Sequence, residues 1–199
     1  MMRKTICLIG LLLFNYVLLA QNNTTQKTDS LNKSTFKNTD SFKMLSKNDI
    51  VTNISGDTEY STFNRLIQIT GLNETFKSKG PITVFAPNNQ AFANLSKGKL
   101  DTLLMEERKY DLIALVTYHA LAGIVKAKDI AHAISVGKGT ASFITITGSK
   151  LVAKFDTNHN IILVDENGVQ SIVSKFDVKQ ENGLIHLING VLIPQFKNI

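Results

Sequence analysis

The spacing of apolar residues changes part-way along the chain, and this change restricts the fold more than any other feature. Between residues 49 and 136, apart from one strand-like run, apolar residues recur every three or four positions, as on helices with one buried face. From residue 143 onward the period is two, which is typical of strands. Helices that cluster early and strands that cluster late indicate an α+β fold and argue against alternating strand–helix units.

Turn and cap residues divide these two regions into individual elements. Asn88 follows a strand-ending proline and can cap the helical turn at 88–95. The other expected helices cover 49–56, 61–70, 72–79, 100–116 and 129–136. The expected strands cover 82–86, 143–146, 151–155, 161–164, 169–176 and 184–193, with glycine- or asparagine-containing turns between the late ones.

Two of these strands are expected to be buried on both faces. In 82–86 the neighbours Val84 and Phe85 point to opposite sides, and both are apolar. Residues 184–188 likewise show little alternation between apolar and polar side chains. The Asn182-Gly183 pair before them predicts a turn that needs a positive φ angle.

The N-terminus has the pattern of a secretory signal peptide. Arg3 and Lys4 precede an apolar run that ends at Ala20, before a polar stretch. An uncleaved membrane anchor is the alternative, but the run is about fifteen residues, against the roughly twenty that a spanning helix needs. We therefore expect residues 1–20 to be removed, residues 21–47 to form a flexible polar spacer, and residues 48–197 to form the folded domain of an exported protein.

Export changes what the composition implies. Cleavage would remove Cys7, the only cysteine, and lower the formal charge from +6 to +4. The mature chain would then have no disulfide and no thiolate ligand, and no stable membrane insertion is expected. The basic residues are scattered without a run of five, so nucleic acid is not an expected partner.

No motif in the chain predicts catalysis, a metal or a cofactor. There is no Gly-x-Ser-x-Gly, no His-Glu-x-x-His and no phosphate-binding glycine loop. His119 and His186 lie in apolar segments without a second ligand at metal-binding spacing. We interpret both histidines as buried, hydrogen-bonded core residues.

Three segments carry a resemblance to a known family. They are residues 83–92 (TVFAPNNQAF), the pair Tyr118-His119, and residues 182–192 (NGLIHLINGVL). In this order and spacing they resemble the fasciclin (FAS1) domain family over about residues 48–195. The chain differs at Gln90 and Asn189, which are uncharged where the family pattern is commonly acidic.

The resemblance implies a FAS1 fold, with a β-sandwich-like core and helices clustered in the N-terminal half. It also implies a secreted or cell-envelope adhesion module without catalytic activity, whose partner is a cell-surface or matrix protein or a polysaccharide. The family's contact positions match Tyr118 and His119, and Asp177 and Val178, where valine replaces isoleucine.

Tyr118 and His119 also have a purely structural interpretation as core support. Adjacent residues of a strand point to opposite faces, so one ring is expected inside and the other outside. We expect His119 to hydrogen-bond in or near the turn at 88–89 and Tyr118 to face the outer surface. The alternative function is a small-ligand or glycan-binding or processing protein with a groove between the helices and the sandwich.

Overall fold

The computed structural model describes residues 43–78 and 80–196. The expected signal peptide and residues 21–42 of the expected spacer lie outside the described residues. The described end of that spacer is tied to the domain, because Met44 packs against the core and the Leu45 N–H donates to Asn53 Oδ1 at 2.9 Å. Contacts with the folded domain therefore begin at Met44 or earlier, a few residues before the boundary expected at residue 48.

Helices dominate the first half, as the apolar period predicted. Asp49 caps the first helix by accepting the Thr52 N–H, and Asn88 caps the fourth by accepting the Ala91 N–H, so both helical starts are confirmed. The helices are α1 (Ile50–Gly56), α2 (Ser61–Ile69), α3 (Asn73–Ser78), α4 (Asn89–Ala93), α5 (Lys99–Leu103), α6 (Lys109–Tyr118) and α7 (Ala127–Val136), with 3₁₀ turns at Thr58–Tyr60 and Glu106–Arg108.

The single long helix predicted over 100–116 is wrong. Leu104 ends α5, Met105 is extended, and a 3₁₀ turn precedes α6. The break falls in the run 105–110, whose residues are all exposed. With no buried side chain there to hold one helical register, α5 and α6 pack their apolar faces independently.

The strands form one mixed sheet in the order β2-β1-β7-β6-β5-β4-β3. Their bounds are β1 (Ile82–Pro87), β2 (Ala120–Ala122), β3 (Thr140–Ile144), β4 (Lys150–Phe155), β5 (Ile161–Val164), β6 (Gln170–Gln180) and β7 (Gly183–Ile188). Strands β1 and β7 are parallel, and the other pairs are antiparallel. A bridge between Leu121 and Thr145 joins β2 to the segment after β3, so the sheet nearly closes into a barrel. The α+β prediction is confirmed, and the sandwich-like core is this sheet folded back on itself.

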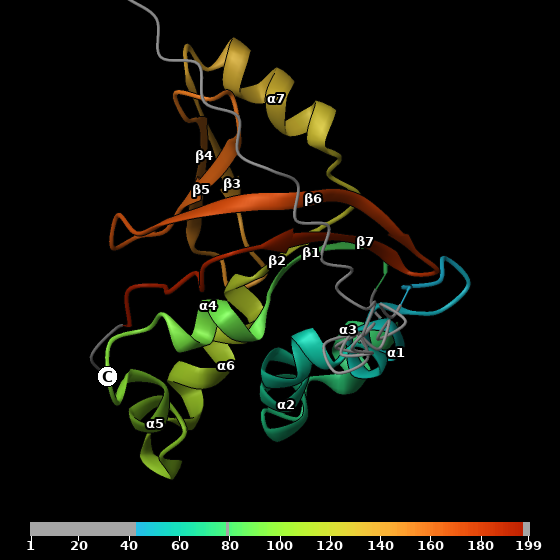
Figure 1. Cartoon of the computed structure of the whole chain (residues 1–199), viewed down its shortest axis with the longest axis vertical. Coiled ribbons are helices and arrows are strands. Elements are labelled where there is room, and N and C mark those ends of the chain that lie inside the picture. Colours follow the sequence, from blue (N-terminus) through green and yellow to red (C-terminus); the bar gives the residue numbers. More distant parts are fainter. Residues whose placement is uncertain (1–42, 79, 197–199) are drawn as a thin grey trace, which may run out of the picture. The chain divides into compact units, whose positions relative to one another are not determined.

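Strands β1 and β7 lie between helices α1–α6 and the part of the sheet that α7 covers (Figure 1), and they separate two apolar cores. The helical core lies among α1–α6, and the barrel core lies between the sheet and α7. All six residues of β1 are buried, with Val84 in the helical core and Phe85 in the barrel core. The two-sided burial predicted for 82–86 is therefore confirmed. It is also confirmed for β7, where Ile185 and Ile188 lie in different cores.

Gly183 has a different role from the predicted one. Its φ is not positive, unlike that of Gly168 in the turn after Asn167. A Cβ on Gly183 would lie 1.9 Å from the Ile82 carbonyl oxygen, so glycine is needed for the close approach of β7 to β1.

Candidate functional site

Tyr118 is buried, so the prediction that it faces the outer surface is wrong. Its side chain has 0% exposure and packs in the barrel core. The hydroxyl donates to the Lys150 carbonyl oxygen at 2.7 Å. Burial, followed by the charges of Glu166 and Asp165, raises the pKa of Tyr118, which keeps the hydroxyl protonated as a donor.

His119 is equally buried, as predicted, but its partners differ from the expected ones. Nδ1 donates to the Leu115 carbonyl oxygen at 2.8 Å, and Nε2 accepts the Leu192 N–H at 3.0 Å. We assign this neutral tautomer because a backbone N–H can only donate. The side chains of the turn at 88–89 bind other groups instead. The ring therefore connects α6 to the last of the three sequence blocks rather than to the first.

Both residues are interior because they end a helix and do not belong to a strand. Tyr118 is the last residue of α6, and His119 is its C-cap. Successive residues on a helix are about 100° apart around the axis, so two neighbours can enter two different cores. Tyr118 enters the barrel core, whereas the His119 ring contacts that of Phe63 in the helical core, with 5.4 Å between ring centroids.

The burial of His119 predicts that the domain loses stability in mild acid. Burial lowers the pKa of His119 to about 4, against about 6.5 in the unfolded chain, and the hydrogen bond to Leu115 opposes this only in part. Between these values the unfolded chain binds a proton that the folded chain does not. Stability is therefore complete above about pH 7 and should fall by about 2 kcal/mol by about pH 5 from this group alone.

NMR titration of the histidine ring protons tests this pH dependence directly. The His119 signal should stay in its neutral position down to about pH 5, and denaturant midpoints should fall over the same range. A His119 signal that titrates near pH 6.5 in the folded protein would contradict the assignment.

Asp177 and Val178 lie on β6 where the strand bulges. Register shifts against β7 occur around this point, and Asp177 has a φ of 53°. Its side chain is 41% exposed, whereas Val178 is partly buried against the helical core. Of the four predicted contact residues, Asp177 is therefore the one whose polar group reaches the surface. The other three side chains support the fold.

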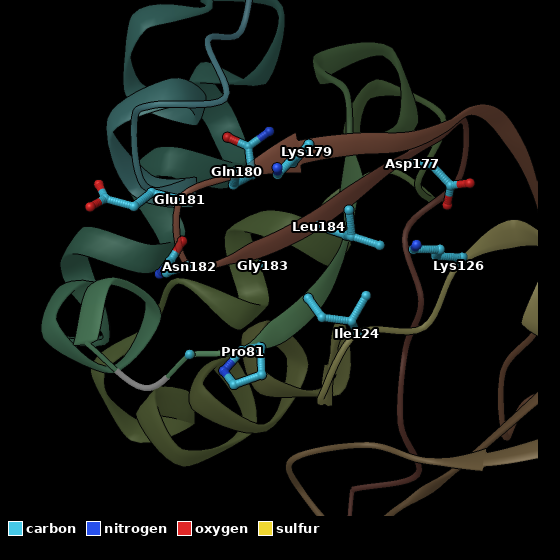
Figure 2. A pocket seen from close by; sticks show the side chains of 11 residues that line it. Pro81, Ile124, Lys126, Asp177, Lys179, Gln180, Glu181, Asn182, Gly183 and Leu184 are labelled. Carbon is cyan, nitrogen blue, oxygen red and sulfur yellow. The ribbon is translucent and has the colours of Figure 1, made fainter.

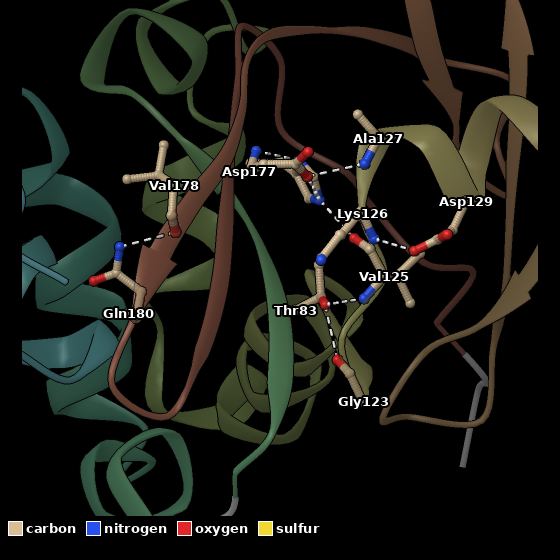
Figure 3. Close-up of polar contacts among 10 residues, drawn as sticks. Thr83, Gly123, Val125, Lys126, Ala127, Asp129, Asp177, Val178 and Gln180 are labelled. Atoms are coloured by element: carbon tan, nitrogen blue, oxygen red, sulfur yellow. Dashed lines mark hydrogen bonds and ion pairs between the residues drawn. The ribbon is translucent and has the colours of Figure 1, made fainter.

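Residues 123–127 form a short segment that crosses the sheet beside Asp177. We call this segment the strap. Thr83 Oγ1 on β1 donates to the Gly123 carbonyl at 2.8 Å and accepts the Val125 N–H at 2.9 Å (Figure 3). Asp177 Oδ1 on β6 accepts the Ala127 N–H at 2.9 Å. The strap is thus fixed to two strands, and one of its bonds also fixes the Asp177 carboxylate.

His186 is buried, as predicted, and its ring hydrogen-bonds to the strap. Its Nε2 donates to the Val125 carbonyl at 2.8 Å, and its Nδ1 accepts the Asp177 N–H at 3.3 Å. The ring stacks on Phe85 with 5.4 Å between centroids. Burial lowers the pKa of His186, opposed by the Val125 bond and the Asp177 charge.

A groove of about 690 Å³ lies between the strap and the hairpin that joins β6 to β7. Figure 2 shows Ile124 and Leu184 near its centre and Pro81 below them, with Lys126 and Asp177 on one side and Glu181 and Asn182 on the other. It lies on the sheet face that carries Asp177, not between helices and sandwich as the small-ligand alternative expected. Apart from Asp177, sequence reasoning did not select its side chains as site residues, because they come from separate segments with no shared motif.

The described residues offer no conventional metal site or membrane span. Within residues 43–78 and 80–196, no three His, Cys, Asp or Glu side chains are grouped to hold a metal ion. In the same part of the chain, no helix has the length and apolarity to cross a bilayer.

Comparison with known proteins identifies the family. Residues 58–194 match the family model described as the fasciclin domain. The chain belongs to the fasciclin domain family. Protein sll1483 from Synechocystis sp. is 31% identical to it over 145 residues, which cover 73% of each chain. Human periostin is 30% identical over 141 residues, 71% of this chain but only 15% of periostin, so the match is to a small part of that protein.

The solved structures confirm the FAS1 fold. A FAS1 domain pair from the insect cell adhesion molecule Fasciclin I matches with a TM-score of 0.59 and 18% identity. The match covers 75% of this chain and 51% of the other, which shows a common fold. The fasciclin domain predicted from the three sequence blocks is thus confirmed.

Proposed function

We propose that this fasciclin domain is an exported, non-catalytic adhesion module that binds a cell-surface or matrix protein or a polysaccharide. Family membership supports the class of function, since the solved neighbour is a cell adhesion molecule. The pattern of residues 1–20 supports export. The contact surface in this proposal is the strip around Asp177, next to the groove.

The fixed Asp177 carboxylate is the observation that carries the proposal. It is exposed, yet Oδ1 is held by the Ala127 N–H, and the backbone at this bulge is fixed by His186. A charged group that is already immobilised loses little conformational entropy when a partner binds. The second carboxylate oxygen has no hydrogen bond among the described residues and can accept one from a partner donor.

Val178, Tyr118 and His119 act in this proposal without touching the partner. Val178 packs on the helical core directly after the bulge, so it anchors the backbone that carries Asp177. Tyr118 and His119 fix the end of α6 against Lys150 and Leu192. Variants of these two buried residues should therefore change stability before they change binding.

Replacing Asp177 with asparagine should weaken binding and leave stability almost unchanged. The amide oxygen of asparagine can still accept the Ala127 N–H, so the strap stays in place while the charge is lost. We expect the affinity for an immobilised cell-envelope protein fraction, or for those glycans of an array that bind the wild-type domain, to fall by about tenfold or more. The free energy of unfolding should change by less than about 0.5 kcal/mol.

Asp129→Asn is the matched control. Asp129 is also exposed and accepts one backbone N–H at the start of α7, from Lys126 at 2.9 Å. It does not line the groove. Equal loss of binding in both variants, or full binding by the Asp177 variant, would exclude a contact role for Asp177.

A further inference from the structure

We propose that the groove is a binding site for a small amphipathic carboxylate, a molecule with an apolar body and one anionic head group. Asp177 lines one side of the same groove, but the binding of this ligand does not depend on the adhesion contact proposed for Asp177. The inference rests on three observations: the apolar floor, the rigidity of the strap and the two lysines at the rim.

The floor of the groove is apolar and open to solvent. Ile124 is 43% exposed and Pro81 beside it is also exposed, whereas Leu184 is only 5% exposed (Figure 2). The volume of about 690 Å³ is in the range that holds small organic ligands. A ligand with the length of a medium-chain fatty acid would remove this apolar surface from water.

The Ile124 side chain stays exposed to solvent, because hydrogen bonds of the neighbouring residues fix the backbone of the strap before and after it. The Gly123 N–H donates to the Pro81 carbonyl at 2.8 Å, and Thr83 binds both the Gly123 carbonyl and the Val125 N–H. These bonds flank Ile124 directly in sequence. The exposed isoleucine is thus a fixed feature of the folded domain, and a bound ligand is one way to cover it.

The positions of the charged side chains at the rim favour the binding of an anion above the floor of the groove. Two lysines and two acidic residues line the groove, so recognition depends on where each charge lies. Figure 2 shows Lys126 directed toward Leu184, whereas Glu181 points away from the floor. Figure 2 also shows the Asp177 carboxylate directed away from Leu184, and its Oδ1 accepts the Ala127 N–H.

Neither lysine is neutralised within the domain. Lys126 and Lys179 form no ion pair with any residue of 43–78 or 80–196. Both are exposed, and Lys179 lies opposite Leu184 in the register of β6 and β7. A carboxylate near these ammonium groups would gain charged hydrogen bonds while its apolar tail covers the exposed Ile124 and Pro81.

Titration of the full chain with decanoate, below its micellar concentration, tests this site. Decanol provides the same tail without charge, and acetate provides the head group alone. Two-dimensional NMR should show saturable shifts of the Ile124, Gly183 and Leu184 amides with decanoate. Decanoate should bind about tenfold more tightly than decanol, and acetate should not saturate the site.

The double variant Lys126→Ala and Lys179→Ala should abolish the preference for decanoate over decanol. The matched control is Lys128→Ala with Lys175→Ala, which removes one exposed lysine from α7 and one from β6 but none from the groove lining. Circular dichroism should show equal melting temperatures for both double variants. Absence of saturable binding, equal affinity for decanol, or equal loss in the control variant would overturn the proposal. Asp177→Asn removes a negative charge from the groove lining and keeps both lysines, so this variant should bind decanoate at least as tightly as the wild type while it loses the adhesion partner, and the two proposals can fail separately.

Discussion

Replacing His119 with alanine should lower the free energy of unfolding by about 4 kcal/mol, enough to remove a large share of the stability of a domain this size. The ring has 0% exposure, so its removal leaves a cavity beside Phe63. It also leaves the Leu192 N–H and the Leu115 carbonyl without their side-chain partner in the interior. Unpaired buried polar groups cost about 1–3 kcal/mol each, in addition to the cavity. Urea denaturation at about pH 7.5 measures the loss without interference from histidine protonation.

Tyr118→Phe is the matched control for this prediction. It keeps the ring in the barrel core and removes only the hydroxyl that donates to Lys150. The cost should be about 1 kcal/mol. If His119→Ala unfolded at the same urea concentration as the wild type and lost only binding, His119 would be a contact residue and its structural interpretation would be wrong.

Replacing Gly183 with alanine should prevent stable folding, with a loss of more than about 4 kcal/mol. The new Cβ would lie 1.9 Å from the Ile82 carbonyl oxygen and 3.0 Å from its carbonyl carbon. Both atoms are backbone, so no side chain can rotate away to make room. The clash sits at the first residue pair of the parallel β1–β7 ladder, which separates the two cores. Relief would require the two central strands to move apart and expose both apolar faces.

Gly168→Ala separates this steric effect from backbone preference. Gly168 has a φ of 81°, but a Cβ there would have no neighbour within 4 Å. Its replacement should cost about 1–2 kcal/mol, from the left-handed conformation alone. Thermal melts of the two variants should differ widely. Similar melting temperatures for both would show that β1 and β7 can adjust to a side chain at position 183.

Elements whose signals lie within a few residues could be predicted from the sequence. The predicted cap Asn88 sits next to the helix it starts, and its hydrogen bond to the Ala91 N–H spans three residues. The consecutive apolar residues Val84 and Phe85 indicated a strand between two cores before either core was defined. The family resemblance also came from short ordered blocks, and residues 58–194 match the family model.

The sequence could not show how those blocks contact one another. Tyr118 and His119 were interpreted as strand residues because Ala120 and Leu121 follow them, yet they end α6. The Leu192 N–H that His119 Nε2 accepts is 73 residues further along the chain, and this pairing follows from where the chain after β7 crosses the end of α6. A local period contains no information about such a crossing.

The sequence by itself determined the order and type of most elements, the two-sided burial of β1 and β7, and the buried state of the two core histidines. These features depend on local apolar spacing and on hydrogen bonds between near neighbours. Only the tertiary structure decided which of the predicted contact residues reach solvent, why residue 183 is glycine, and that a groove exists. Closure of the sheet brings the strap, β1 and the β6–β7 hairpin together, and steric fit and hydrogen bonds between such distant segments arise only in the closed sheet.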